Sequence, residues 1–429
     1  MNQTQPKIIV IDDDPTGSQT VHSCLLLMQW DVETLKQGLL DRAPIFFILS
    51  NTRAMNPQQA AETTQTICQN LKVAIAETNI KDFLVVSRSD STLRGHYPVE
   101  TDVIAEELGG FDAHFLTPAF FEGGRITADL THYLLVKGER ISVAETEFAR
   151  DSVFSYSHGY LPDYVAEKTQ SRILSEQVVK LPLSDIRDRK ILPRLLKLTN
   201  NQCVVVDGEI QQDYDTFAEA VLEAAANGKR FLFRSAASLL TSLAQLGQQP
   251  VSAAEMASYR ASDRPGVVLV GSHVQKTTEQ LQRLLEEEQV VGIEVDVASL
   301  RDRPEDQASL RQSISDAVEL AFAENKTAVV YTSRSELSFA NVQQRLQFGV
   351  AVSTLLMEIV QNLPQSLSFL ISKGGITSND VLSVGLNLTE ARLLGQILPG
   401  CSVIRTEPDH SQFPNLPVVL FPGNVGDRD

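Results

Sequence analysis

Cysteine and tryptophan are scarce in this chain of 429 residues, which has four cysteines and one tryptophan. The cysteines are isolated, without a Cys-x-x-Cys pair or a nearby histidine at the spacing of metal ligands. The sequence therefore predicts no protein-held metal site. We interpret the thiols as small, inert apolar groups of the interior. They are Cys24, Cys68, Cys203 and Cys401.

Positive charge is also in short supply, with 37 Lys and Arg against 54 Asp and Glu and a net charge of −17. Because an acidic surface repels phosphate backbones and anionic lipid headgroups, we expect no nucleic-acid partner and no membrane surface. No apolar run approaches the roughly 20 residues that span a bilayer. The polar start Met1–Pro6 lacks the features of a secretory signal, which predicts a cytoplasmic protein with a small-molecule partner.

Apolar residues are plentiful, at 43% of the chain, and charged residues make up 21%. This balance is typical of folded globular proteins, and the length favours two large domains. Short apolar runs alternate with helical patterns in both halves, as in βαβ units. We predict an α/β protein with two open, mostly parallel domains, residues 1–246 and 266–429, that face each other across a cleft. A Gln-, Ser-, Ala-, Pro- and Gly-rich linker is predicted over 247–265.

The predicted elements follow from apolar runs and helical periodicity. Asn56 and Pro57 have the character of an N-cap and a first helical residue, and two further helices are expected at Tyr214–Asn227 and within Leu337–Val360. The predicted strands of the first domain are Ile8–Ile11, Ile45–Leu49, Phe83–Val86, His114–Thr117 and Cys203–Val206, and those of the second are Val267–Val270, Val291–Val295, Ala328–Tyr331, Phe369–Ile371, Val403–Arg405 and Val418–Phe421.

Polar side chains follow successive strands of the first domain, at the sheet edge where open α/β folds bind ligands. Arginine forks there suit the carboxylate of a small hydroxy acid, Asp and Ser or Thr suit its hydroxyls, and an aspartate could accept a proton. Each segment alone is also typical of turns and N-caps. Four segments are involved: 12–18 (Asp-Asp-Asp-Pro-Thr-Gly-Ser), 50–53 (Ser-Asn-Thr-Arg), 87–95 (Ser-Arg-Ser-Asp-Ser-Thr-Leu-Arg-Gly) and 123–125 (Gly-Gly-Arg).

Glycine-containing loops follow three strands of the second domain, in segments 271–273, 372–379 and 422–426. Glycines let backbone N–H groups approach an anion closely, so such loops can hold the phosphates of a nucleotide. Glycine also serves purely steric needs in tight turns, and no Walker P-loop or Gly-x-Gly-x-x-Gly is present. Lys373 is the one lysine in these loops and the natural electrostatic partner of a phosphate.

Taken together, these loops resemble the four-carbon acid sugar kinase family from Ile8 to Gly426. The matching motifs are Asp-Asp-x-Thr-Gly, a Thr-x-Thr-Arg-like segment, Asp-Ser-Thr-Leu-Arg-Gly, Gly-Ser, Gly-Gly-x-Thr and Gly-Asn-x-Gly. The resemblance implies transfer of a phosphoryl group from ATP, with Mg²⁺, to a hydroxyl of threonate, erythronate or an oxo-tetronate. It identifies the first domain as the acid-sugar domain and the second as the nucleotide domain, and it leaves a homodimer open.

The resemblance also implies roles for individual residues. Asp13, Asp90 and Arg94 would be catalytic, with Asp13 or Asp90 accepting the hydroxyl proton and Arg88 or Arg94 neutralising charge. The substrate would contact Asp13, Thr16, Arg53, Arg88, Asp90, Ser91 and Arg94, with Arg53 holding the acid group. The nucleotide would contact Ser272, Gly374, Gly375, Ile376, Thr377 and Gly423.

Pro15 and Ile376 depart from the family pattern, and the Lys-Gly-Gly-Ile-Thr-Ser string indicates a distinct branch. Two other readings stay open. Asp12 and Asp14, spaced as Asp-x-Asp-x-Thr after a strand, match aspartate-nucleophile phosphatases. Alternatively, the protein is a non-catalytic relic that binds a sugar acid without using a nucleotide.

Overall fold

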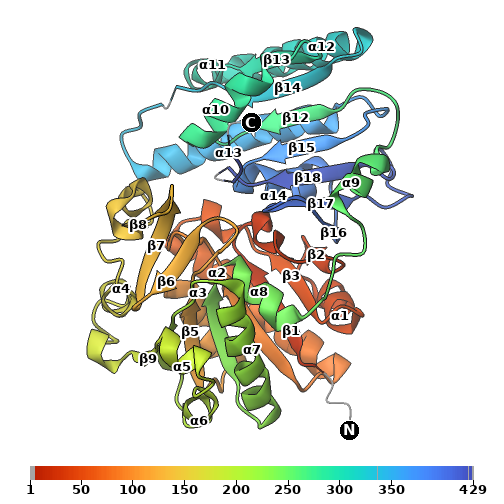
Figure 1. Ribbon diagram of the computed structural model, residues 1–429. Coiled ribbons are helices and arrows are strands. Elements are labelled where there is room, and N and C mark those ends of the chain that lie inside the picture. The colour runs from red at the N-terminus through yellow and green to blue at the C-terminus, as the bar shows by residue number, and fades with distance from the viewer. Residues whose placement is uncertain (1–4, 336, 424, 428–429) are drawn as a thin grey trace. The chain divides into compact units, whose positions relative to one another are not determined.

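The computed structural model describes residues 5–335, 337–423 and 425–427, without the side chains of residues 15, 16 and 342. The chain divides into two compact units, Met1–Gln248 and Gln249–Asp429. Both have the mostly parallel α/β architecture expected from the sequence, so the predicted fold class is confirmed (Figure 1). The cleft and the linker limits stay predictions. The predicted linker segment contains the short helix α9 (Ala253–Met256) and the 3₁₀ turn η6 (Ala257–Tyr259).

The first unit is built on a fully parallel sheet in the order β2-β3-β1-β4-β11-β5-β10-β9. Its central strands are buried on both faces, which explains their continuous apolar runs. All five predicted strands are confirmed, whereas β2, β9 and β11 escaped prediction. The strands are β1 (Lys7–Asp12), β2 (Leu25–Leu27), β3 (Ile45–Leu49), β4 (Phe83–Arg88), β5 (Ala113–Thr117), β9 (Val179–Leu181), β10 (Gln202–Val206) and β11 (Phe231–Ser235).

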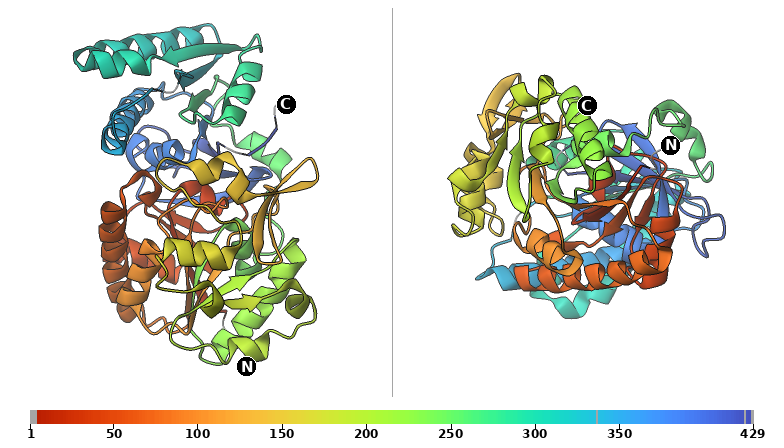
Figure 2. Two further views of the ribbon diagram at one scale, coloured as in Figure 1. Left: turned by 90° about the vertical axis from the view of Figure 1, so that its left-hand side faces the viewer. Right: turned by 90° about the horizontal axis from the view of Figure 1, so that it is seen from below.

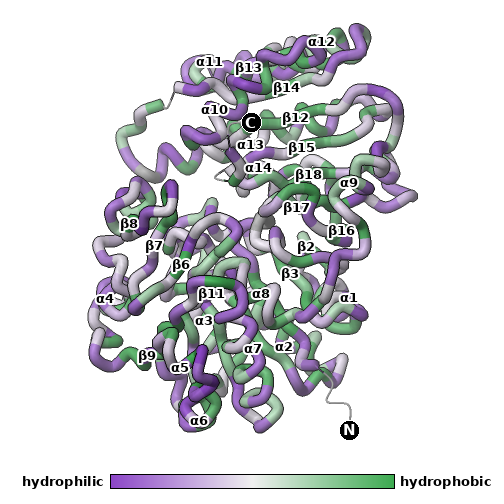
Figure 3. The backbone as a smooth tube through the Cα atoms, viewed as in Figure 1, coloured by the Kyte–Doolittle hydropathy of each residue, from purple (hydrophilic) through white to green (hydrophobic). Residues whose placement is uncertain are grey.

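Helices cover both faces of this sheet, with α1, α2 and α3 on one face and α7 and α8 on the other (Figure 2). The predicted start of α2 is confirmed, because Asn56 accepts from the Gln59 backbone N–H in a capping box and Pro57 is the first helical residue. Figure 3 shows the strands between these layers largely in the green of apolar residues. The helices are α1 (Val32–Leu40), α2 (Pro57–Thr78), α3 (Val99–Leu108), α4 (Leu161–Lys168), α5 (Leu183–Arg187), α6 (Leu192–Leu195), α7 (Gln211–Ala226) and α8 (Ala237–Ala244).

A small antiparallel sheet follows β5 and was not predicted from the sequence. It consists of β6 (Arg125–Ala128), β7 (Thr131–Val136) and β8 (Glu139–Ser142). An isolated bridge between Thr127 and Gly208 ties it to the loop after β10. The small sheet thereby brings Arg125 and His132 near the edge where the polar loops lie.

The second unit has the strand order β13-β14-β12-β15-β18-β17-β16, parallel from β13 to β18 and antiparallel beyond. All six predicted strands are confirmed, and β16 was missed. Its strands are β12 (Val267–Val270), β13 (Val290–Val295), β14 (Thr327–Thr332), β15 (Leu370–Lys373), β16 (Glu390–Leu398), β17 (Cys401–Arg405) and β18 (Pro417–Phe421).

The helices of the second unit include a long one that begins at Val342, five residues later than the pattern from Leu337 suggested. In the part of the chain that the structure describes, no helix combines the length and apolar character needed to cross a bilayer. The helices are α10 (Gln275–Leu284), α11 (Val297–Asp302), α12 (Gln307–Ala323), α13 (Val342–Gln361) and α14 (Gly375–Asp380), followed by a π-helical turn at Val381–Gly385.

Candidate functional site

The polar loops of the first unit meet because β3, β1 and β4 are adjacent and parallel. At the end of β1, Asp12 is in register with Leu49 of β3 and Arg88 of β4, so the three following loops leave the sheet together. Backbone bonds join them, with the Ser50 N–H donating to the Asp12 carbonyl at 2.9 Å. The convergence expected from the sequence is therefore confirmed.

Asp13 and Arg53 form the central ion pair of this cluster. The Arg53 guanidinium donates from Nε to Asp13 Oδ2 at 2.8 Å and from Nη2 to Oδ1 at 2.7 Å. The Ser89 hydroxyl also donates to Asp13 Oδ2. Asp13 is 1% exposed, so this two-point contact neutralises a buried charge. Arg53 had been expected to hold the acid group of the substrate, but two of its nitrogens face Asp13.

Asp12 and Arg88 form a second ion pair next to this one. Arg88 Nη1 is 3.3 Å from Asp12 Oδ1 and 3.8 Å from Asp13 Oδ1. Burial raises the pKa of the Asp12 carboxyl well above its usual range, although the Arg88 charge lowers it. A Cβ on Gly17 would lie 2.0 Å from Asp12 Oδ2, so the loop backbone covers this carboxylate. The Oδ1 atom of Asp12 is thus paired with Arg88 and its Oδ2 atom is covered by the loop, which disfavours Asp12 as the nucleophile of a phosphatase.

Asp90 organises the loop after β4. It accepts from Arg94 Nε at 2.9 Å and from the Thr92 N–H and hydroxyl, while Arg53 Nη1 is 3.9 Å from its Oδ1. Burial acts to raise the pKa of Asp90, but the charges of Arg94 and Arg53 and these hydrogen bonds hold it below its usual range. A group held in its ionised form is a weak proton acceptor. The predicted role of Asp90 as base is therefore less suitable than that of an organising anion.

Gly95 closes the same loop and must be glycine. Its φ is +118°, and a Cβ there would lie 2.3 Å from Ser89 Oγ and 2.7 Å from Arg234 Nη2. Ser91 is buried, and its carbonyl oxygen accepts from His132 Nε2 at 2.7 Å. The side chain of Thr16, another predicted contact, lies outside the described residues.

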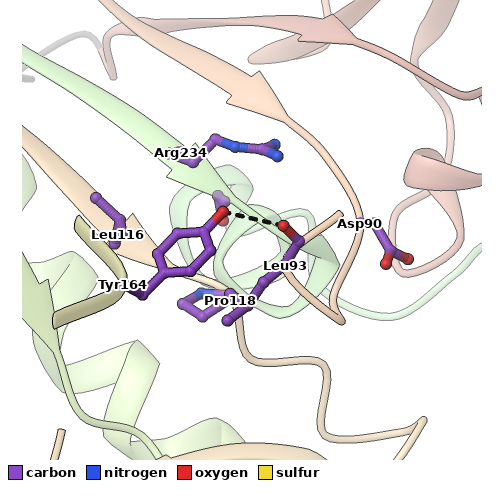
Figure 4. Close-up of a pocket in the computed structure, with 7 residues that line it drawn as sticks. Asp90, Leu93, Leu116, Pro118, Tyr164 and Arg234 are labelled. Atoms are coloured by element: carbon purple, nitrogen blue, oxygen red, sulfur yellow. Dashed lines mark hydrogen bonds between the residues drawn. The ribbon is translucent and has the colours of Figure 1, made fainter. Parts of the chain in front are cut away.

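The sequence predicts no role for two buried arginines of the first unit, although one of them lies in the segment 123–125. Arg125 begins β6 and is 5% exposed, and Arg234 lies on β11 and is 8% exposed. Arg234 donates to the Arg94 carbonyl at 3.1 Å and lines a cavity of about 10 Å³, room for roughly one water. Figure 4 shows this cavity, where the Tyr164 hydroxyl donates to the Leu93 carbonyl. Arg234 comes close to the polar loops because β11 lies between β4 and β5, which the sequence does not reveal.

Two histidines near the site have structural roles. His96 Nε2 lies 3.0 Å from the carbonyl oxygens of both Thr52 and Met55, so this nitrogen carries the proton and donates. Burial lowers the pKa of His96, which keeps the ring neutral. His22 Nε2 lies 3.3 Å from the Gly247 carbonyl. These contacts favour the interpretation of both as hydrogen-bonding residues rather than general bases.

The glycine loops of the second unit converge in the same manner at the ends of β12, β15 and β18, which are neighbours in the sheet. Thr277 Oγ1 donates to the Gly423 carbonyl at 2.8 Å and contacts Ser272 Oγ at 3.2 Å. The Gly374 N–H donates to the Phe421 carbonyl at 2.9 Å. Gly374 has a φ of +125° and a Cβ there would lie 3.2 Å from Ser272, which favours glycine.

The remaining predicted nucleotide contacts lie in the same segment. Gly375 and Thr377 are half-buried, and the Ile376 side chain is 43% exposed. A Cβ on Gly271 would lie 2.1 Å from Thr377 Oγ1, so this threonine packs against the loop after β12. The structure therefore gathers the predicted nucleotide residues of this unit at one sheet edge.

The cations near these loops differ from those expected. Lys373 is 5% exposed, donates to the Pro422 carbonyl at 3.1 Å and lies 3.5 Å from the centre of the Phe421 ring. Burial lowers the pKa of Lys373 to about 8. Sequence reasoning missed Arg334, which follows β14 and donates from Nη2 to the Ser272 carbonyl at 2.7 Å and the Thr278 hydroxyl at 2.8 Å. Its Nη1 is buried and lacks a hydrogen-bond partner among the described residues.

A protein-built magnesium cage does not fit the described residues. Among them, no three His, Cys, Asp or Glu side chains come together as a metal site. The unpartnered Asp12 Oδ2 is buried beside the cation Arg88 and covered by Gly17. A Mg²⁺ ion used here would therefore arrive with nucleotide phosphates, as is common in phosphoryl-transfer enzymes.

Comparison with known proteins assigns separate family models to the two halves of the chain. The sequence model of a sugar-binding N-terminal domain matches residues 8–243, and that of a nucleotide-binding C-terminal domain matches residues 267–429. The D-erythronate kinase of Heliobacterium modesticaldum is 27% identical over 223 residues, which make up 49% of this chain and 47% of the relative. The chain belongs to the four-carbon acid sugar kinase family. The family predicted from the loops is thereby confirmed, although the match spans about half of this relative's length.

Two solved structures share the fold. A candidate tRNA synthase from Salmonella typhimurium LT2 covers 98% of this chain and 97% of its own, with a TM-score of 0.69 and 19% identity. The Haemophilus influenzae protein HI1011 covers the same shares, with a TM-score of 0.60 and 18% identity. At these identities the comparison shows that the two structures share the fold of this chain, and it does not show a shared activity.

Proposed function

We propose that this protein is a kinase that transfers the terminal phosphoryl group of ATP to a hydroxyl of a four-carbon sugar acid, with D-erythronate as the first candidate. The observation that carries the proposal is the pairing of a sugar-binding unit, with a buried Asp and Arg cluster, and a nucleotide-binding unit with converging glycine loops. The matched stretch of the D-erythronate kinase supports the choice of substrate.

In this proposal the first unit positions the acceptor. Asp13 keeps its carboxylate at the end of β1 through Arg53 and Ser89, and it would accept a hydrogen bond from the reacting hydroxyl. Phosphoryl transfer passes through a loose transition state, so alignment and charge neutralisation contribute more than proton removal. Arg94, which is held by Asp90, would stabilise the negative charge that develops on the transferred group.

The second unit would bind the nucleotide through exposed backbone of its loops. One sheet edge carries Ser272, Gly374, Gly375, Thr377 and Gly423. Arg334 adds a cation whose Nη1 has no hydrogen-bond partner in the part of the chain that the structure describes. Mg²⁺ bound to ATP would supply further charge neutralisation at the phosphates. Closure over the substrates would exclude water, which otherwise accepts the phosphoryl group.

The direct test is an ADP-release assay with ATP, Mg²⁺ and a panel containing D-erythronate, L-erythronate, D-threonate, L-threonate and 3-oxo-tetronates. We expect turnover with one or a few of these acids and none with aldoses of the same length. Absence of turnover with every acid, from folded protein, would overturn the proposal. Calorimetry distinguishes the kinase from the non-catalytic relic. Heat of binding from a tetronate without heat from ATP would identify a binding protein that does not use a nucleotide.

A further inference from the structure

Arg125 is a buried cation of the first unit with no carboxylate partner among the described residues. It is 5% exposed, and within the described part of the chain its guanidinium donates from Nη1 to the Gly123 carbonyl at 2.5 Å. Its Nε is buried and has no hydrogen-bond partner among the described residues. Among the residues that the structure describes, no carboxylate lies within ion-pair distance of Arg125. A buried guanidinium in this state is costly unless a ligand supplies the missing charge.

Three other arginines of the site already have carboxylate partners. Arg53 is paired with Asp13, Arg88 with Asp12, and Arg94 with Asp90 and, at 3.7 Å, with Asp151. Arg234 resembles Arg125 in forming no salt bridge among the described residues; it donates to the Arg94 carbonyl at 3.1 Å, and Glu100 acts on it at longer range. Arg125 interacts with Asp90 and Arg94 at longer range only, and burial lowers its pKa. An incoming anion therefore gains more beside Arg125 than beside Arg53, Arg88 or Arg94.

The chain is shaped to admit this guanidinium. Arg125 lies 5.9 Å from the centre of the Phe120 ring, and the backbones of these two residues form a bridge. A Cβ on Gly123 would lie 2.2 Å from Arg125 Nη1 and 2.4 Å from the Phe120 ring. Glycine at position 123 thus leaves the space that the guanidinium fills, and a side chain there would displace it.

We infer that Arg125, rather than Arg53, binds the carboxylate of the sugar acid and gives the enzyme its preference for acids over neutral polyols. This inference rests on the proposed function and adds a specificity-determining residue to it. A guanidinium offers two parallel N–H donors to a carboxylate, which a hydroxymethyl or amide group cannot match in charge. The hydroxyl end of the substrate then points toward Asp13.

The experiment compares D-erythronate with D-erythronamide and erythritol, which keep the hydroxyls and lack the charge. Steady-state kinetics and nucleotide-free calorimetry are measured for the wild type, Arg125→Met, Arg125→Lys and Gly123→Ala. We expect Arg125→Met to raise the KM and the dissociation constant for D-erythronate by about 100-fold, with kcat at saturation changed far less. The KM and dissociation constants for D-erythronamide and erythritol should not change. Arg125→Lys should give KM and dissociation constants for D-erythronate between those of the wild type and Arg125→Met. Gly123→Ala should resemble Arg125→Met because it displaces the guanidinium.

Arg230→Met is the matched control, since Arg230 also stacks on aromatic rings of the first unit, those of Phe83 and Phe111. It should leave the preference for acids intact. If Arg125→Met retains that preference, or weakens acids and neutral analogues equally, the role of Arg125 is refuted. A wild type that neither binds nor phosphorylates any tetronate refutes the proposed function instead. The Arg125→Lys and Gly123→Ala variants keep the test valid if the methionine variant fails to fold.

Discussion

Asp13 keeps a negative charge where water scarcely reaches, because Arg53 contacts both of its carboxylate oxygens and Ser89 adds a third donor. The geometry leaves Asp13 an acceptor with fixed orientation. Such groups position a substrate well, since little rearrangement is needed when the hydroxyl arrives. Because the same contacts neutralise a buried charge, substitution here should lower stability as well as activity, so each variant needs a folding control.

Asp13→Asn should reduce kcat with the preferred tetronate by at least about 100-fold, because the amide replaces the charged acceptor and turns a donor toward Arg53 or Ser89. ADP release at saturating substrate measures the effect, and thermal melting checks that the protein folds. Asp102→Asn is a suitable control, since Asp102 pairs with Arg172 at an exposed position. A variant at position 13 with wild-type kcat would contradict the assignment.

Arg334→Met should weaken binding of ATP about tenfold while leaving the affinity for the sugar acid unchanged. The reason is that the guanidinium holds the Ser272 loop through its carbonyl and has one buried nitrogen free of partners among the described residues. Calorimetry with a non-hydrolysable ATP analogue measures the change. Arg283→Met provides the comparison, because Arg283 pairs with Glu286 and Glu287 on the surface of α10 and should have no effect.

For individual residues, the sequence predicted that Asp13, Arg53, Asp90 and Arg94 lie close together. Parallel strands bring the loops that follow them to one sheet edge, whatever the details of packing. The sequence could not assign partners. The buried state of Lys373 depends on the Phe421 ring of another strand, and the uncompensated state of Arg125 depends on the β6 turn. Both are consequences of tertiary contacts that the local pattern does not record.

Among the elements, β7 supports the substrate loop through His132. The ring is fully buried, its Nε2 donates to the Ser91 carbonyl at 2.7 Å, and its Nδ1 accepts from the Thr127 hydroxyl at 3.0 Å. Burial lowers the pKa of His132 to about 4, although its backbone hydrogen bonds act in the opposite direction. The native state therefore requires the neutral ring.

Stability should consequently fall as the solution is acidified through the interval from the unfolded pKa of about 6.5 to the folded value of about 4, since the unfolded chain binds the proton there and the folded chain does not. The difference corresponds to roughly 3 kcal/mol in the free energy of unfolding. Urea unfolding of wild type and His132→Gln at several pH values measures it. The glutamine variant, which keeps a donor for Ser91, should show a smaller decrease; equal decreases would exclude His132 as the cause.

Elements differed in how well the sequence predicted them. Central strands such as β3 and β12 were found with their full extent because apolar runs buried on both faces leave a clear signal. β11 was missed although it is central, since Arg234 and Ser235 interrupt its short apolar run. The antiparallel strands β6 to β8 have mixed burial and no long apolar stretch, so local pattern alone could not separate them from loops.

For the whole molecule, the division into two units predicts separable thermal behaviour. Each unit has its own buried apolar clusters, one around Phe46 and Ile67 and another around Val268 and Val329. D-erythronate should raise the melting temperature of the first unit, and an ATP analogue that of the second, because each ligand stabilises the unit that binds it. Differential scanning calorimetry with each ligand alone tests this. If either ligand shifts all of the unfolding heat equally, the units do not bind their ligands independently.

The position of β11 has a consequence for synthesis of the protein. This strand is the last of its sheet in the sequence, at Phe231–Ser235, yet it lies between β4 and β5. While the ribosome is still short of that segment, β4 and β5 have no strand to join them, and each has an open backbone edge. The amino-terminal half therefore cannot complete its sheet gradually during translation. The sheet is completed only when this one late segment inserts, and until then the unpaired edges of β4 and β5 are open to pairing with other chains.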